Sequence, residues 1–132
     1  MKETITWEPL SRYFPDRVLP SQCPTRIVLD HVTSRWGVLI LVSLAEEGLR
    51  WSELHRRVEG VSEKMLAQTL RILQEDGLVH REVQPNTPPT VEYSLTELGR
   101  ELVVRLLPLF EWIAANADTI VGGMEASAGS TN

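Results

Sequence analysis

The chain has 132 residues and a formal net charge of −5; 42% of its residues are hydrophobic and 23% are charged. This length supports one domain with a single hydrophobic core, and the composition excludes a wholly disordered chain. The negative charge argues against strong binding to nucleic acid irrespective of its sequence, although it leaves room for a locally basic surface.

The N-terminus and the cysteine content narrow the class of protein further. The opening MKETITWEPL lacks the apolar core of a signal peptide, and the longest aliphatic run, VLILV, is too short to cross a bilayer. We therefore expect a cytoplasmic protein that has no contact with a membrane. The single cysteine, Cys23, excludes an intramolecular disulfide, and no CxxC pair indicates a structural zinc site.

The beginning of the chain is expected to form an irregular arm and then two helices. Residues 1–22 combine prolines with scattered aromatic residues, which is typical of irregular structure. Helical spacing starts at Pro24, and because proline suits the first helical position, Cys23 is the expected N-cap. After Ser34, a favourable N-cap residue, an almost entirely apolar segment predicts a central helix that ends at Gly48.

Two shorter helices are expected next. Ser52 is the predicted N-cap of the first, ELHRRV, and Ser62 that of the second, which ends at Gly77. The turn between them contains Gly60. Two short helices joined by a tight turn that contains glycine are typical of a helix-turn-helix.

A hairpin and a long helix complete the predicted fold. The segments LVHREVQ and TVEYSL have the composition of strands, and Val91, Tyr93 and Leu95 alternate with polar residues as in a strand covered on one face. The loop PNTPP joins the two strands. Thr96 is the expected N-cap of the last helix, over residues 97–120.

The order of these elements predicts a mainly α fold with a small β-hairpin. It is that of a winged helix-turn-helix with flanking N- and C-terminal dimerisation helices, over residues 23–121. Pro108 should kink the last helix. The small, polar residues 122–132 predict a disordered tail.

The second helix of the helix-turn-helix has two different sides. At about 100° per residue, one side carries its leucines and should face the core: Leu66, Leu70 and Leu73. Lys64, Gln68 and Arg71 fall on the opposite side. Taken alone, this division also fits the solvated face of any amphipathic helix.

The surrounding residues favour a DNA-reading surface instead. Arginine and glutamine match the edges of guanine and adenine, and basic side chains before and after the helix match phosphates. The N–H groups that follow a serine N-cap can also face a phosphate. The candidate DNA-binding residues are Arg50, Arg56, Arg57, Ser62, Lys64, Gln68, Arg71 and Arg81.

The charge of this region limits the expected affinity. From Arg50 to Arg81 there are six Lys or Arg residues and five Asp or Glu residues, so the segment is nearly neutral. We therefore expect modest, strongly salt-dependent binding that needs a dimer to double the contacts.

The last helix has more apolar surface than one domain needs. One stripe consists of Leu98, Leu102, Leu106, Leu109 and Ile113, and a second consists of Val103, Leu107, Phe110 and Ala114. Because the core of a monomer requires only one stripe, the surplus predicts a dimer interface with Leu102, Leu106, Leu109, Phe110 and Ile113. The alternative is that both stripes are buried within one chain.

Three segments covering roughly residues 23–113 carry a family resemblance: CPTRIVLDHVTSRWGVLIL, GLRWSELHRRVEGVSEKMLAQTLRILQEDGLVHREV and PPTVEYSLTELGREL. They resemble the HxlR-type family of bacterial winged-helix regulators, relatives of the MarR group. The resemblance implies a homodimer that binds a near-palindromic operator in double-stranded DNA and regulates transcription, in our interpretation as a repressor. One departure is Thr90, at a position after the wing prolines where relatives often have Lys or Arg.

The resemblance also gives Cys23 a role. Many members of the family respond to oxidants or electrophiles through a cysteine before the first helix, which corresponds to Cys23 here. At a helix N-cap its thiolate would gain from the positive end of the helix dipole, and Arg26 lies one turn further on. The alternative is a plain thiol with no signalling role.

Two other functions compete with a thiol-switched regulator. The first is a winged-helix module that binds protein and does not read DNA. The second is a DNA-binding regulator that is switched by a small ligand held between the long helices and the arm. We expect no enzyme, cofactor or metal site, because no nucleophile has a matched base and the three histidines lack metal-ligand spacing.

Overall fold

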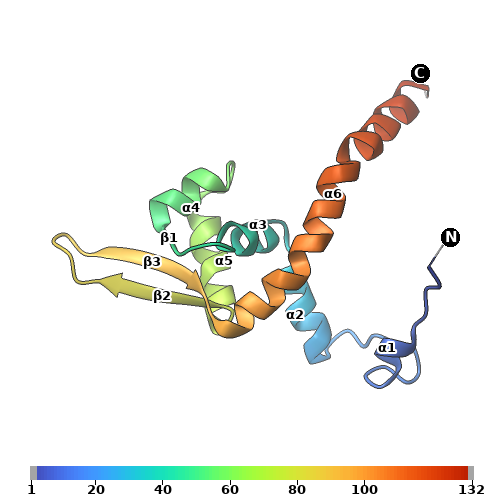
Figure 1. Ribbon diagram of the computed structural model, residues 1–132, viewed down its shortest axis with the longest axis horizontal. Coiled ribbons are helices and arrows are strands. Elements are labelled where there is room, and N and C mark those ends of the chain that lie inside the picture. Colours follow the sequence, from blue (N-terminus) through green and yellow to red (C-terminus); the bar gives the residue numbers. More distant parts are fainter. Residues whose placement is uncertain (1–2, 131–132) are drawn as a thin grey trace.

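The structure, a computed structural model, describes the backbone of residues 3–130 and the side chains of residues 3–123. Its elements, in chain order, are α1 (Glu8–Ser11), α2 (Pro24–Val32), α3 (Arg35–Ser43), β1 (Leu49–Arg50), α4 (Trp51–Arg57), α5 (Glu63–Glu75), β2 (Val79–Gln84), β3 (Thr90–Leu95) and α6 (Glu97–Ser130). Figure 1 shows α3, α4 and α5 gathered in a central body, from which the β2–β3 hairpin and α6 project in different directions. The fold is the expected winged helix-turn-helix. Within the described residues, no helix is long and apolar enough to cross a membrane.

The core lies between α3, α4, α5, the sheet and the first turns of α6. Its largest fully buried side chains are all aliphatic: Ile40, Leu41, Leu44, Leu49, Leu54, Leu66, Leu70 and Leu73. Full burial of such a side chain stabilises a fold by about 1.5–3 kcal/mol. All three predicted core leucines of α5 are in this set, so the core fixes the rotation of α5 about its own axis.

The strand β3 lies at the centre of a three-stranded antiparallel sheet with the order β1-β3-β2. Tyr93 is paired with Leu49 on one side and with Arg81 on the other. Tyr93 and Leu95 are buried, which confirms the predicted alternation along β3. The hairpin tip, residues 85–89, lies far from the helical body (Figure 1).

Of the N-cap residues predicted from the sequence, all but Ser52 are observed at the start of a helix. The predicted N-caps that lie at a helix start are Cys23, Ser34, Ser62 and Thr96. The prediction for Ser52 is wrong, because α4 starts at Trp51 and its N-cap is Arg50. The Glu53 carboxylate accepts a hydrogen bond from the Arg50 N–H at 2.9 Å and so satisfies the N-terminus in place of a serine hydroxyl.

The central helix α3 is shorter than predicted. It ends at Ser43 and not at Gly48, because the chain must turn to bring Leu49 into the core and into β1. Gly48 suits this turn because a Cβ there would lie 3.1 Å from the backbone carbonyl oxygen of Tyr93, which is closer than most Cβ contacts. An apolar sequence pattern alone does not mark this end of the helix.

The N-terminal segment of the chain is mostly irregular, whereas the C-terminal segment is helical. The N-terminal arm is irregular apart from α1, and Phe14 is its buried residue. The predicted disordered tail is not observed over most of its length, because α6 continues to Ser130. Alanine, methionine and glutamate in residues 124–128 favour helix and support this continuation. Residues 131–132 of the expected tail lie outside the described residues.

Most of the apolar surface of α6 is exposed. Leu106 is buried in the core of its own chain and does not belong to the exposed surplus, contrary to the prediction. Leu102 is only partly buried, so its place in a dimer interface stays a prediction. By contrast, Leu109, Phe110 and Ile113 are 54%, 37% and 48% exposed. The alternative that one chain buries both stripes is therefore wrong for this part of α6. The helix is continuous through Pro108, and a kink there stays a prediction.

A second exposed apolar surface lies on α2. Its aliphatic side chains Ile27, Val28 and Leu29 are each nearly half exposed, while Val32 is buried. Val28 and Val32 line a shallow apolar hollow together with Leu98 and Leu102 of α6. Val28, one of the exposed apolar residues of α2, therefore lies close to the first turns of α6.

Candidate nucleic-acid interface

The polar side of α5 is the centre of the candidate site. Leu66, Leu70 and Leu73 are buried against the core, whereas the side chains on the opposite side point outward. We call the exposed set Lys64, Gln68 and Arg71 the α5 polar surface. The structure thus brings together on one surface the three residues that the sequence predicts there.

Hydrogen bonds hold the start of α5 in place. The Ser62 hydroxyl accepts from the Met65 N–H at 3.1 Å, as expected for an N-cap. Thr69, which the sequence reasoning did not single out, is buried and donates its hydroxyl proton to the Met65 carbonyl at 2.8 Å. Its position one residue before Leu70 was the available signal, because residues 66, 69, 70 and 73 share one helical side.

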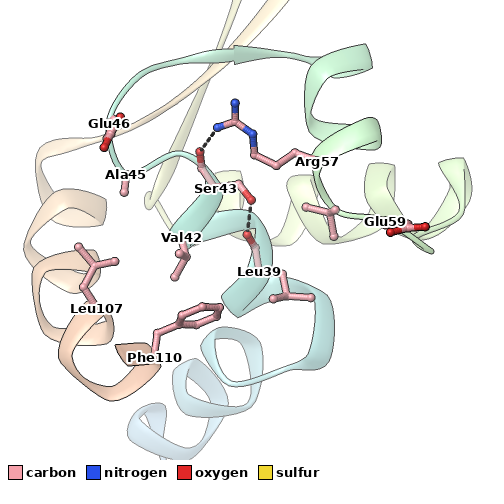
Figure 2. A pocket seen from close by; sticks show the side chains of 10 residues that line it. Leu39, Val42, Ser43, Ala45, Glu46, Arg57, Glu59, Leu107 and Phe110 are labelled. Carbon is pink, nitrogen blue, oxygen red and sulfur yellow. Dashed lines mark hydrogen bonds between the residues drawn. The ribbon is translucent and has the colours of Figure 1, made fainter. Parts of the chain in front are cut away.

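The two arginines of α4 have different surroundings. Both are exposed, but Arg57 reaches back to α3 and donates to the Ser43 carbonyl at 3.4 Å, a long hydrogen bond. Figure 2 shows Arg57 above a hollow of about 580 Å³, with Val42 and Phe110 below it. Arg57 is therefore directed toward the end of α3, and it is not brought together with the α5 polar surface.

The arginines of the sheet do not share a face. Arg50 pairs with Glu92 across β1 and β3, while Arg81 pairs with Tyr93 across β2 and β3. Directly paired residues point to the same face of a sheet, and neighbouring residues of a strand point to opposite faces. Since Glu92 and Tyr93 are neighbours, Arg50 and Arg81 lie on opposite faces, which the order of residues in the sequence did not reveal.

The wing tip is held by a side-chain contact. Asn86 donates from Nδ2 to the hydroxyl of Thr90 at 3.1 Å. This bond spans the proline-rich loop and joins it to the first residue of β3. The tip presents no lysine or arginine, so Arg81 is the basic residue of the hairpin.

Cys23 lies where the arm meets α2. Its backbone caps the helix, its side chain makes no capping hydrogen bond, and the residue is partly buried. Cys23 lines a hollow of about 360 Å³ with arm residues that include Tyr13 and Phe14. The Arg26 guanidinium donates to the Leu19 carbonyl at 2.9 Å, so it fastens the arm to α2.

Two further polar contacts were not predicted from the sequence. His31 Nδ1 lies 2.8 Å from a carboxylate oxygen of Asp76, which links the end of α2 to the end of α5 across 45 residues of sequence. Arg35 stacks on the ring of Trp36 at the start of α3. In the part of the chain that the structure describes, no group of three or more His, Cys, Asp or Glu residues is arranged to hold a metal ion.

Comparison with known proteins identifies relatives at both the sequence and the structural level. The chain is 53% identical over 100 residues to the HTH-type transcriptional regulator YtfH of Escherichia coli, an alignment that covers 76% of this chain and 79% of the relative. The solved structure of the putative transcriptional regulator YtfH from Salmonella typhimurium is 50% identical, with a TM-score of 0.74 over 80% of this chain and 95% of that one. The redox regulator HypR in its reduced form is 36% identical, with a TM-score of 0.68 over 76% and 99% of the two chains.

The family model of the HxlR-like helix-turn-helix matches residues 31–120, which contain α3, the helix-turn-helix, the wing and most of α6. This match covers more than half of the chain, and it includes the α5 polar surface. The chain belongs to the HxlR-like helix-turn-helix family, whose members are DNA-binding transcriptional regulators and not enzymes.

Proposed function

We propose that this protein is a transcriptional repressor that reads a near-palindromic operator as a homodimer, with α5 in the major groove. The observation that carries the proposal is the division of α5, whose apolar side is fully buried while Lys64, Gln68 and Arg71 are exposed together. Arg71 and Gln68 can each form paired hydrogen bonds with one base edge, guanine and adenine respectively. Lys64, near the helix N-terminus, suits a phosphate.

The proposed contacts outside α5 are of a different kind. Arg50, Arg56 and Arg81 are exposed and would bind phosphates, which position the protein without reading the base sequence. Arg57 has a weaker case because it donates to the Ser43 carbonyl. With so few basic residues per chain, we expect modest affinity, and each phosphate contact adds to the decrease of affinity with rising salt, so a dimer doubles both.

The exposed apolar surfaces support the homodimer. Leu109, Phe110 and Ile113 on α6, together with Ile27 and Val28 on α2, are large apolar side chains exposed to water, and exposed apolar patches mark interaction sites. To read two half-sites, such a dimer must present its two α5 helices about 34 Å apart, one helical turn of DNA. Light scattering at low micromolar concentration tests the dimer, and a monomer would contradict it.

Cys23 supports a redox- or electrophile-sensitive form of the repressor. The partly buried thiol lies at the N-cap of α2 and lines the hollow beside the N-terminal arm. A structural relative, HypR, is named a redox regulator and is known in oxidised and reduced forms. An intersubunit disulfide would require the two Cys23 Cα atoms to lie within about 7 Å of each other.

Base reading is tested by binding measurements on a duplex selected from a randomised library and on an unrelated duplex. Replacing Arg71 or Gln68 by alanine should cost about 1–3 kcal/mol of binding free energy for each specific contact, on the selected duplex only. Arg100→Ala, an exposed arginine at the start of α6, is the control and should change neither affinity. Unchanged binding to the selected duplex with Arg71 and Gln68 both removed would contradict direct reading by the α5 polar surface.

A second candidate keeps DNA binding but replaces the thiol by a small ligand. The hollow between α3, α4 and α6 favours it, since Val42, Leu107 and Phe110 offer apolar contacts below the Arg57 guanidinium (Figure 2). In this case a compound that releases DNA should act equally on the Cys23→Ser protein. An inducer that requires the thiol would contradict this candidate.

A further inference from the structure

Arg35 is a basic residue close to α5 that the proposed function has not used. It is the first residue of α3, it is exposed, and its guanidinium carbon lies 4.8 Å from the centroid of the Trp36 ring. A cation held over an indole ring is stabilised and restricted in orientation. The guanidinium is therefore directed by its neighbour while its N–H groups stay accessible.

Helix stability does not explain an arginine at this position. A positive charge at a helix N-terminus opposes the helix dipole, and the first turn of α3 contains no acidic residue to offset it. Asp30 and Arg35 line one hollow, but no ion pair joins them; the ion pair found among the described side chains is that of His31 with Asp76. The charge of Arg35 is thus unpaired within the described part of the chain, at a position where an anion would be favourable.

The location of Arg35 points to the identity of that anion. A hollow of about 400 Å³ between the α2–α3 corner and α5 is lined by Arg35, Trp36, Met65 and Gln68. Trp36 also reaches the turn before α5, since its ring lies 3.8 Å from where a Cβ on Gly60 would be. Arg35 is therefore fixed beside the edge of α5 that carries Gln68.

We propose that Arg35 binds a phosphate of the DNA backbone at the border of the major groove that α5 enters. The inference rests on the proposed function, because α5 must lie in the groove for the phosphates to flank it. With Gln68 at the base edges, the neighbouring strand backbone passes the side of α5 where Arg35 lies. The backbone N–H groups at the start of α3 add a favourable field for the same phosphate. A phosphate contact raises affinity for every sequence and does not select bases.

The chain offers a matched control for this contact. Arg12 also stacks on the ring that follows it, with 5.1 Å from its guanidinium carbon to the Tyr13 centroid, but it lies in the N-terminal arm. Arg35→Ala and Arg12→Ala remove the same charge and the same kind of stacking. Arg35→Lys keeps the charge without the planar fork, and thermal unfolding verifies that each variant is folded.

The experiment measures the dissociation constant by fluorescence anisotropy across a salt series, on a selected duplex and an unrelated duplex. For Arg35→Ala we expect about tenfold weaker binding to both duplexes, the loss of roughly one charge-assisted hydrogen bond. The slope of log affinity against log salt should decrease by about 0.9 per protomer, and Arg35→Lys should retain most of that slope. Arg12→Ala should match the parent protein.

The outcomes separate this inference from the proposed function. If Arg35→Ala leaves affinity and salt slope unchanged while Arg71→Ala weakens the selected duplex, the phosphate contact is overturned and base reading by α5 stands. If Arg35→Ala weakens only the selected duplex, the contact is to a base and the phosphate assignment is overturned. If the parent protein does not distinguish the duplexes, the proposed function fails together with the inference.

Discussion

Helices α5 and α6 are both amphipathic, but the chain itself buries the apolar side of α5 and only part of the apolar side of α6. In α5, every leucine is buried by the same chain, and the exposed side is polar. In α6, burial ends after Leu106, and large apolar side chains such as Trp112 and Ile113 are exposed further along. Figure 1 shows the reason: the first turns of α6 lie against the body, and the rest extends away from it.

This difference indicates which kind of partner each helix suits. The polar surface of α5 costs nothing in water and can exchange hydration for hydrogen bonds with a polar partner such as DNA. The apolar surface of α6 is unfavourable in water and gains from contact with another apolar surface. The following predictions test this contrast, from the largest expected effect to the smallest.

The largest effect is expected in the buried side of α5. Leu70→Ala removes a fully buried side chain and should lower the free energy of unfolding by about 2–5 kcal/mol, as measured by urea denaturation. Lys64→Ala, on the opposite side of the same helix, should stay within about 0.5 kcal/mol of the parent. Equal losses in both variants would show that the two sides of α5 are not separated as described.

The next effect concerns the exposed side of α6. Ile113→Glu places a charge on the proposed dimer surface and should weaken self-association by at least about 1.5–3 kcal/mol, the value of one buried aliphatic side chain. Sedimentation velocity over a concentration series measures it. The control is Ile5→Glu in the arm, where the isoleucine is 96% exposed and no change is expected. A dimer that withstands Ile113→Glu would locate the interface elsewhere.

A smaller effect is expected at the start of α5. Ser62→Ala removes the hydroxyl that accepts from the Met65 N–H and should cost about 1 kcal/mol in thermal or chemical unfolding. Ser52→Ala is a pointed comparison, because the sequence pattern predicts a cap there and the structure gives that role to the Glu53 carboxylate. It should change stability by less than about 0.5 kcal/mol. A larger loss at Ser52 than at Ser62 would contradict the observed caps.

The smallest effect on stability is expected at Cys23, whose side chain makes no capping hydrogen bond. The free energy of unfolding of Cys23→Ser should lie within about 0.5 kcal/mol of that of the parent. Under reducing conditions the two proteins should bind DNA equally well. With diamide or a quinone, only the parent should release the duplex in a mobility-shift assay. If the serine variant responds like the parent, Cys23 is not the sensor.

Local sequence patterns were sufficient for most of the fold. The spacing of Leu66, Leu70 and Leu73 gave the buried side of α5, and the alternation around Tyr93 gave the covered face of β3. Both depend on the fixed periods of helix and strand. The end of α3 could not be obtained this way, since it depends on the need to bring Leu49 beside β3.

The residues of the candidate site also fall into those whose grouping follows from a local pattern and those whose grouping depends on tertiary contacts. Lys64, Gln68 and Arg71 share a surface because they belong to one helix, so the sequence alone determined their grouping. Whether residues from different elements meet was decided by tertiary structure: Arg57 was drawn toward Ser43, and Arg50 and Arg81 were assigned to opposite faces by strand pairing. The placement of Arg35 beside Gln68 likewise results from the packing of α3 against α5, a contact between distant segments that no local period encodes.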